Sequence, residues 1–119
     1  MTIKETQIEK MSTILKVASD PTRLKIMYSL LDDGKCHCHC CEPGNCAKCS
    51  CLSCMIEKKV NDIALELGAS QSLISHQLKT LKDAGIVKVR KESTSAYYSL
   101  DDGHIKELLS VVKAHIEEE

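Results

Sequence analysis

Aromatic side chains are nearly missing from this chain of 119 residues, which has no Trp, no Phe and only three Tyr. A packed interior must therefore be aliphatic, and a chain of this length has room for one modest core. A small core favours association with further chains, because a partner can bury additional apolar surface. We expect one domain over residues 1–119 that forms oligomers.

A strong net charge and a long apolar run are also missing. The formal net charge is −1, so binding to nucleic acid would need a local basic surface. The amino-terminal residues MTIKETQIEK are charged and lack the apolar run of a signal peptide, and no stretch approaches membrane-spanning length. We therefore expect a cytoplasmic protein that has no membrane partner.

Cysteine, in contrast, is abundant and confined to one segment, residues 36–54. Thiols stay reduced in the cytoplasm, and disulfides within this segment would staple one loop only. The segment has no hydrophobic period, which predicts an insertion that is ordered by metal or not ordered. Its C-x-C and C-x-x-C spacings favour Cu(I), Cd(II), Zn(II), Pb(II) or arsenite. The predicted thiolate ligands are Cys36, Cys38, Cys40, Cys41, Cys46, Cys49, Cys51 and Cys54.

Apolar residues recur at helical spacing along most of the remaining chain. The helix-starting pair Asp20-Pro21, the capping residue Ser70 and the helix-ending Gly68 and Gly85 mark the boundaries. The predicted helices cover 4–18, Pro21 to about Asp33-Gly34, 59–67, 70–84, and a last segment from about Gly103 onward. Strand-like runs at 86–89 and 97–100 predict a β-hairpin. The predicted fold is mainly α with a small β-hairpin.

The predicted helices 59–67 and 70–84, with a tight turn at Gly68-Ala69, match a helix-turn-helix. One face of the second helix carries short hydroxyl, amide and cationic side chains, which suit base edges and phosphates. Two cations of the hairpin would meet backbone phosphates. The predicted DNA contacts are Ser70, Gln71, Ser72, Ser75, His76, Lys79, Arg90 and Lys91. The plain alternative is a polar surface helix followed by a solvated hairpin.

The segments DPTRLKIMYSLL, NDIALELGASQSLISHQLKTLKDAGIVKVRKES and AYYSL together resemble the ArsR/SmtB family of metal-sensing repressors. The resemblance covers nearly the whole chain outside the Cys-rich insertion and is most specific from Ser70 to Val87. It implies a homodimeric winged helix-turn-helix protein. It also implies a repressor that binds operator DNA when metal-free, releases it when metal binds, and so controls metal resistance or efflux genes.

Near the carboxy terminus, Asp102-x-His104 is followed after ten residues by His115-x-x-Glu118. On one helix the two His would lie about 20° apart around the axis but about 16 Å apart along it. Zinc–ligand bonds are about 2 Å, so one ion cannot reach both His of a single helix. An antiparallel second copy would bring Asp102 and His104 of one chain to His115 and Glu118 of the other.

Two His and two carboxylates suit Zn(II) and tolerate Co(II). The resemblance implies the same site, because this spacing characterises the carboxy-terminal zinc site of one branch of the family. Each residue also has an ordinary interpretation: Asp102 as a helix cap, Glu118 as part of an acidic tail, and the two His as surface residues.

The insertion leaves several alternatives open. Cys36-His37-Cys38 falls where some family members carry a C-x-C pair at the start of the third helix, but a long extra segment follows it here. Lys59-Val60-Asn61 is equally the aligned segment. The alternative functions are a soft-metal sensor that uses the insertion and a metallothionein-like buffer. We do not expect an enzyme, because no βαβ context surrounds the Cys46/Cys49 pair and no Gly-rich phosphate loop is present.

Overall fold

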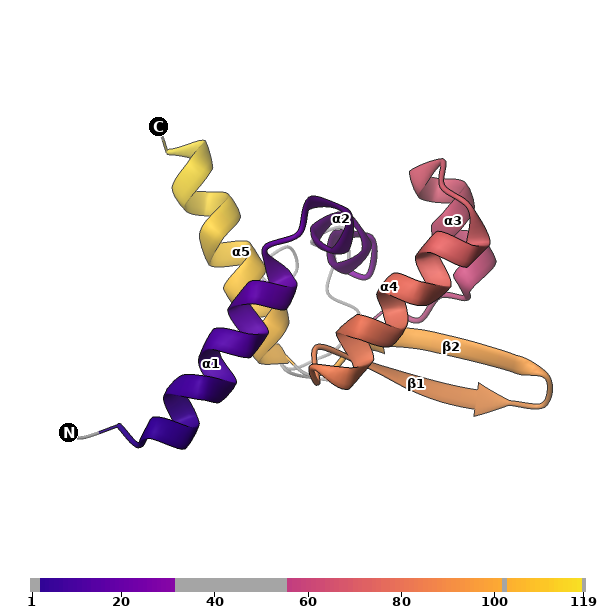
Figure 1. Cartoon of the computed structure of the whole chain (residues 1–119). Coiled ribbons are helices and arrows are strands. Elements are labelled where there is room, and N and C mark those ends of the chain that lie inside the picture. The colour runs from indigo at the N-terminus through magenta and orange to yellow at the C-terminus, as the bar shows by residue number, and fades with distance from the viewer. Residues whose placement is uncertain (1–2, 32–55, 102, 119) are drawn as a thin grey trace, which may run out of the picture.

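The computed structural model describes residues 3–31, 56–101 and 103–118 (Figure 1). The elements in these ranges are α1 (Glu5–Ala18), α2 (Pro21–Ser29), α3 (Val60–Leu67), α4 (Gln71–Asp83), β1 (Val87–Glu92), β2 (Ser95–Leu100) and α5 (Gly103–Glu117). The predicted class, mainly α with a small hairpin, is confirmed. The Cys-rich segment 36–54 and Asp102 lie outside the described residues, so the predicted insertion stays a prediction. No helix in the described ranges is long and apolar enough to cross a membrane.

One aliphatic core joins α2, α3, α4 and the hairpin. Its largest fully buried side chains are Ile26, Met27, Leu30, Ile63, Ile74, Leu78, Leu81, Ile86 and Leu100. The aromatic Tyr98 packs against this core but stays partly exposed. The prediction of an aliphatic interior is therefore confirmed. Only Leu109 of α5 is among the buried apolar residues, and α1 contributes partly buried residues alone.

The helix boundaries follow the capping residues that the sequence predicts. The backbone N–H of Arg23 donates to Asp20 Oδ2 (3.1 Å), and the N–H of Leu73 donates to Ser70 Oγ (3.1 Å). Gly68 (φ +64°) and Gly85 (φ +77°) adopt the left-handed conformation after α3 and α4, where a side chain would add strain. The tight turn between α3 and α4 therefore has the geometry of a helix-turn-helix.

The second helix ends earlier than predicted, at Ser29 rather than near Asp33-Gly34. The N–H groups of Leu30 and Leu31 donate to carbonyls three residues back, each at 3.1 Å, which tightens the last turn and ends the helix. Within this helix Leu24 is 37% exposed, whereas Ile26 and Met27 are fully buried.

The hairpin forms an antiparallel pair that runs from Val87↔Leu100 to Glu92↔Ser95, closed by two turn residues. The first of these, Ser93, has a φ of +57°, as tight two-residue loops require. On its other edge, β2 pairs with Lys58, which lies two residues before α3. The backbones of Lys58 and Tyr98 exchange hydrogen bonds of 2.9 and 2.8 Å. These bonds hold the hairpin beside the helix-turn-helix, and its tip projects away from the body (Figure 1).

Candidate DNA interface and metal site

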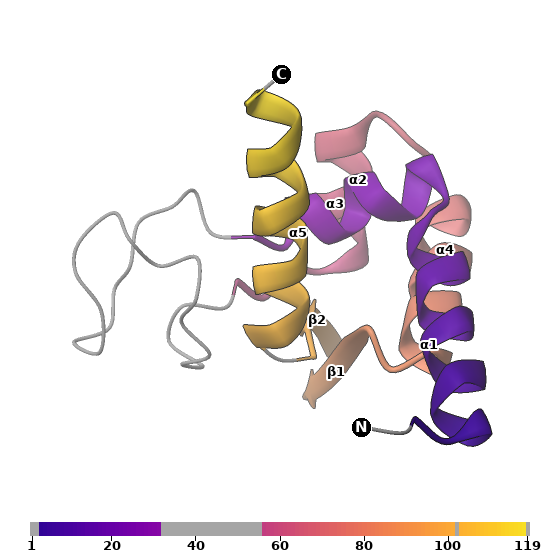
Figure 2. The ribbon, with the colours of Figure 1, turned by 90° about the vertical axis from the view of Figure 1, so that its left-hand side faces the viewer.

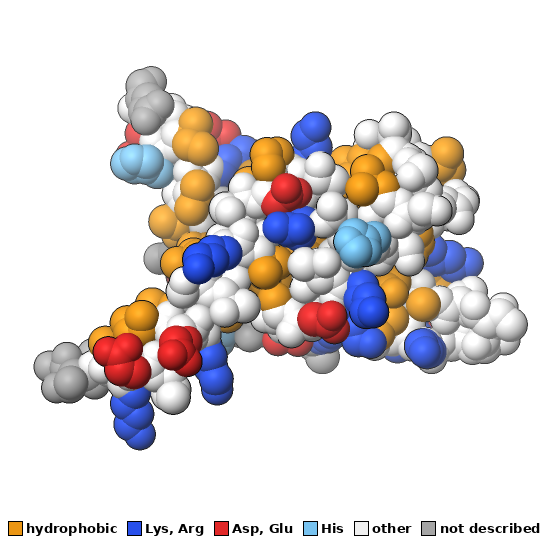
Figure 3. All heavy atoms as spheres, viewed as in Figure 1, with side chains coloured by type: hydrophobic (Ala, Val, Ile, Leu, Met, Phe, Trp, Pro, Cys, Tyr) orange, Lys and Arg blue, Asp and Glu red, His pale blue; other side chains and the backbone are white. Residues whose placement is uncertain are grey.

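Helix α4 has one buried face and one exposed polar face. Ile74, Leu78 and Leu81 are fully buried, and the opposite face presents the hydroxyl, imidazole and ammonium groups that are predicted to contact DNA. A groove runs along this face and is lined by Ser72, Ser75, His76, Lys79, Lys82, Asp83 and Tyr98. Lys and Arg side chains gather over α4 and the hairpin on the right of Figure 3. The structure therefore brings four of the predicted DNA contacts together in one groove.

Two predicted contacts at the start of α4 already have partners within the protein. Ser70 Oγ accepts the N–H of Leu73, although its own O–H remains able to donate to a phosphate. Gln71 Nε2 donates to Asn61 Oδ1 (2.8 Å) and so ties the first turn of α4 to α3. The amino-terminal end of α4 keeps its helix-dipole preference for anions.

In the hairpin, Arg90 is held by two carboxylates. Its Nε donates to Glu57 Oε2 (2.9 Å) and its Nη1 to Glu92 Oε2 (2.6 Å). The guanidinium also lies 4.8 Å from the centre of the Tyr97 ring, and Lys59 Nζ lies 5.5 Å from the same ring. These two bonds use two of the five N–H donors of the guanidinium, so a phosphate bound by Arg90 would share it with the two carboxylates. Lys91, the other predicted contact in the hairpin, is exposed.

These ion pairs favour the charged form of both partners, so they shift the two pKa values in opposite directions. The hydrogen bond to Glu57, followed by that to Glu92, raises the pKa of Arg90 above its ordinary value. The hydrogen bond from Arg90 lowers the pKa of Glu92 below the usual range. All three side chains are substantially exposed, so these pairs contribute little to stability. Their effect is to fix where the hairpin, the wing of the winged helix, presents positive charge.

Sequence reasoning missed the partners of the hairpin. Glu57 and Arg90 are 33 residues apart, and no local pattern links them. Tyr98 reads in the sequence as a strand residue, yet it also borders the groove of α4. The sequence pattern of the second strand does not indicate that Tyr98 also lies beside α4.

One continuous helix, α5, carries both predicted His ligands. His104 and His115 are exposed, and so is Glu118, whose N–H donates to the Ala114 carbonyl (3.2 Å) just beyond the helix end. Helix geometry then separates the two His by about 16 Å along the axis. Within ranges 3–31, 56–101 and 103–118 of one chain, no three His, Cys, Asp or Glu side chains lie together as a metal site. Imidazole nitrogens and carboxylate oxygens on an exposed helix fit a borderline ion such as Zn(II).

The structure also bears on the two alignments of the Cys-rich segment. Helix α3 begins at Val60 with Lys59 at its N-cap, so Lys59-Val60-Asn61 occupies the start of this helix. Cys36-His37-Cys38 belongs to the part of the chain for which no placement is described. Among the described residues, no Cys stands at the start of α3.

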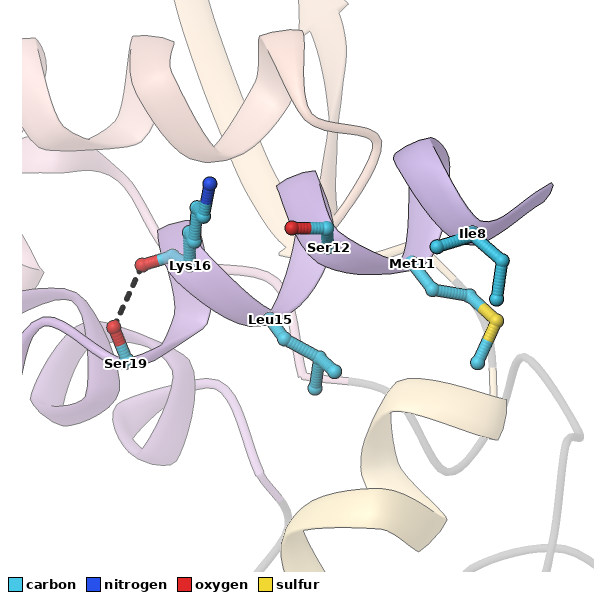
Figure 4. Close-up of a pocket in the computed structure, with 6 residues that line it drawn as sticks. All are labelled: Ile8, Met11, Ser12, Leu15, Lys16 and Ser19. Carbon is cyan, nitrogen blue, oxygen red and sulfur yellow. Dashed lines mark hydrogen bonds between the residues drawn. The ribbon is translucent and has the colours of Figure 1, made fainter. Parts of the chain in front are cut away.

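The outer helices α1 and α5 expose apolar side chains. On α1, Ile8, Met11 and Leu15 are between 44% and 55% exposed, and together they line a groove (Figure 4). On α5 the exposed apolar residues are Leu108, Val111, Val112 and Ile116. We call these seven residues the outer apolar face. Both helices lie on the same side of the molecule (Figures 2 and 3), so the face is presented to one direction.

Known proteins share both the sequence pattern and the fold. The pattern described for bacterial regulatory proteins of the arsR family matches residues 54–89. An uncharacterized HTH-type transcriptional regulator of Methanocaldococcus jannaschii is 38% identical over 104 residues, which cover 87% of this chain and 92% of that protein. The chain belongs to the arsR family.

A cadmium resistance transcriptional regulatory protein (CadC homolog) of Staphylococcus aureus is 35% identical over 102 residues, which cover 86% of this chain and 66% of that relative. The solution structure of a homodimeric winged helix-turn-helix DNA-binding domain from Mycobacterium bovis has a TM-score of 0.70 at 21% identity, and the match covers 99% of this chain and 92% of that one. This member of the arsR family is thus a winged helix-turn-helix transcriptional regulator and not an enzyme.

Proposed function

We propose that this arsR-family regulator is a homodimeric, metal-responsive repressor. It binds operator DNA when metal-free and releases that DNA when Zn(II) or Cd(II) bridges the two chains. The observation that carries this proposal is the outer apolar face together with the two His of α5. Both features need a second chain, the first to cover apolar surface and the second to complete a ligand set.

DNA binding is assigned to the exposed face of α4 and to the hairpin. Ser72, Ser75, His76 and Lys79 line the groove on the exposed face of α4. If this helix entered the major groove of DNA, they would face base edges and phosphates. Ser70 and Gln71 lie at the end of α4 that favours a phosphate. Arg90 and Lys91 extend the cationic surface along the wing.

The dimer is assigned to the outer apolar face. Leu108, Val111, Val112 and Ile116 of α5 are 39–60% exposed in one chain, and large contiguous apolar surfaces usually mark interaction sites. A two-fold axis perpendicular to α5 would place it against α5 of the partner in the antiparallel direction. The Mycobacterium bovis domain of the same fold is homodimeric.

The metal site is assigned to Asp102 and His104 of one chain with His115 and Glu118 of the other. When bound, the metal would supply a bridge between two α5 helices. Because half-site spacing on DNA is fixed, a bridge that reorients the two α4 helices weakens binding. A coupling of about 1–3 kcal/mol is ordinary for such a switch.

A second candidate is a soft-metal sensor that uses the cysteines of 36–54. Glu57 and Lys58 follow the last of them by only three and four residues, and both contact the hairpin through Arg90 and Tyr98. Metal at the insertion would therefore act on the wing rather than on α5. A metal buffer is the third possibility, and it predicts metal binding without any effect on DNA.

One titration separates these proposals. Duplexes are first selected from a random pool by the metal-free protein, and their release is then followed with Zn(II), Cd(II), Cu(I) and Pb(II). The proteins are the wild type, a His104→Gln/His115→Gln double variant and a variant that lacks residues 36–54. Loss of release in the double variant alone supports the α5 site. Loss in the deletion alone supports the soft-metal sensor, and no release with any metal contradicts both.

A further inference from the structure

Arg23 of α2 connects three helices through its backbone and guanidinium. Its backbone N–H caps the start of α2 on Asp20. Its Nε donates to the Val17 carbonyl of α1 (2.6 Å), and its Nη1 donates to Gln77 Oε1 of α4 (3.0 Å). Both Arg23 and Gln77 are only partly exposed, so the contact lies between helices and not in open solvent.

The Val17 bond completes the end of α1. Ser19 already satisfies the carbonyls of Leu15 and Lys16, through its N–H and its hydroxyl (Figure 4 shows the latter bond). The Val17 carbonyl is taken by Arg23, whose positive charge also suits the negative end of the α1 dipole. Arg23 therefore fixes the last turn of α1 relative to α2.

On α4, the helix proposed to read DNA, Gln77 lies at the border between the buried face and the exposed face. Gln77 is preceded by His76, which faces the groove, and followed by Leu78, which is fully buried. A hydrogen bond at this position resists rotation of α4 about its own axis. Helix α1 also packs directly against α4, so the Arg23 bonds hold a contact that the two helices already make (Figure 2).

We propose that Arg23 is a positioning residue for DNA recognition. By bonding Val17 and Gln77 together, it fixes the rotation of α4 relative to α1, which carries part of the outer apolar face. In a dimer this sets the geometry of the two recognition helices on one operator. The inference rests on the proposed function, because it needs two chains on one DNA site.

The chemistry of arginine is required for this role. A guanidinium presents several N–H donors in a rigid plane, so it can hold two acceptors at a fixed angle. The ammonium of a lysine keeps the charge but not that geometry. Arg23→Lys therefore removes the positioning while leaving the electrostatics in place, and Gln77→Met removes the acceptor on α4 with little change in side-chain size.

The experiment measures binding of metal-free wild type, Arg23→Lys, Gln77→Met and the double variant to three DNA probes. The first is the duplex selected by the wild type, the second is the same duplex with one base pair inserted at its centre, and the third is unrelated duplex. Lys25→Met, at an exposed position of the same helix, is the control. Urea unfolding of each protein reports stability separately.

We expect each single variant to bind the selected duplex about tenfold more weakly, as the loss of one hydrogen bond to a charged donor allows. The double variant should lose no more than Arg23→Lys, because each substitution alone already breaks the connection between Val17 and Gln77. The inserted base pair should cost the variants less affinity than it costs the wild type, and affinity for unrelated duplex should not change.

The inference would be overturned by additive losses, by an unchanged penalty for the inserted base pair, or by losses matched by the Lys25→Met control. If the variants lose only stability, Arg23 is structural and the positioning role is wrong. If the wild type selects no duplex at all, the proposed function fails instead, and the two failures are thus distinguished.

Discussion

The body formed by α2, α3, α4 and the hairpin differs sharply from the outer helices α1 and α5. In the body, the apolar side chains that face the core, such as Ile63 and Leu78, are fully buried. On the outer helices the same spacing leaves Leu15 55% and Ile116 60% exposed. The surface that would read DNA is therefore assembled within one chain. The surface proposed to sense metal, in contrast, needs a second chain to complete its ligand set.

This difference also separates two kinds of polar contact. Polar residues of the body form hydrogen bonds with residues far away in the sequence, as the bonds from Arg23 to Gln77 and from Arg90 to Glu57 illustrate. On the outer helix α5, every residue from Val111 to the helix end, and Glu118 just after it, is exposed. A metal ion or a partner chain can reorganise such a region without opening the core.

The largest expected effect is on the stability of the body. Leu78→Ala should lower the free energy of unfolding by roughly 2–5 kcal/mol, because it leaves a cavity in the core. Leu65→Ala, at a position of α3 that is 74% exposed, should change it by less than about 0.5 kcal/mol. Urea unfolding followed by circular dichroism measures both. Equal losses would mean that the core is not where the structure places it.

The next effect concerns association of the outer helices. Val112→Glu should weaken the dimer at least a hundredfold, or by about 3 kcal/mol, because the carboxylate would be buried without a partner. The helical content should stay unchanged, since Val112 is 50% exposed in one chain. Sedimentation at several concentrations measures the association. A dimer of unchanged strength would show that the outer apolar face is not the interface.

A smaller effect is expected for one cation of the groove. Lys79→Ala should weaken binding to all duplexes by a similar factor and reduce the slope of log K against log salt by about 0.9, as for one lost phosphate contact. Glu117→Gln on α5 is the control, since Glu117 pairs with Lys113 (3.4 Å) and does not line the groove. A loss confined to one sequence would instead assign Lys79 to a base.

The smallest effect is a titration in the wing. The Glu92 carboxyl should titrate below the usual range because Arg90 holds it charged, and Arg90→Gln should return its pKa to the ordinary Glu range. With a lowered folded-state pKa, the contribution of this pair is present above the ordinary Glu range and is lost as the pH falls through the lowered value. NMR titration of the side-chain carboxyl measures it. An ordinary pKa in the wild type would contradict the ion pair.

Local signals in the sequence predicted most of the fold. Asp20-Pro21, Gly68, Ser70 and Gly85 mark helix ends through their own backbone chemistry, and the structure confirms each boundary. The predicted end of α2 was wrong, because the chain tightens at Leu30 and Leu31 into bonds to carbonyls three residues back, and no Gly or Pro marks the place.

The candidate sites were predictable to a different degree. Helical spacing places His76 and Lys79 on one face of α4 from sequence alone. The same periodicity shows that α1 and α5 each have an apolar face, but it does not say what covers that face. Contacts such as Arg23–Gln77 join residues 54 apart, and only the packing of the helices brings them together.

The most direct test of the central claim, a metal site shared between two chains, uses mixed dimers. His104→Gln and His115→Gln chains are prepared separately and titrated with Co(II), whose absorption reports its ligands, before and after mixing. Neither variant alone should bind Co(II) tightly at α5. After mixing, each heterodimer should regain one tight site, made by the intact His104 of one chain and the intact His115 of the other. Tight binding by either variant alone, or no recovery on mixing, would contradict the shared site.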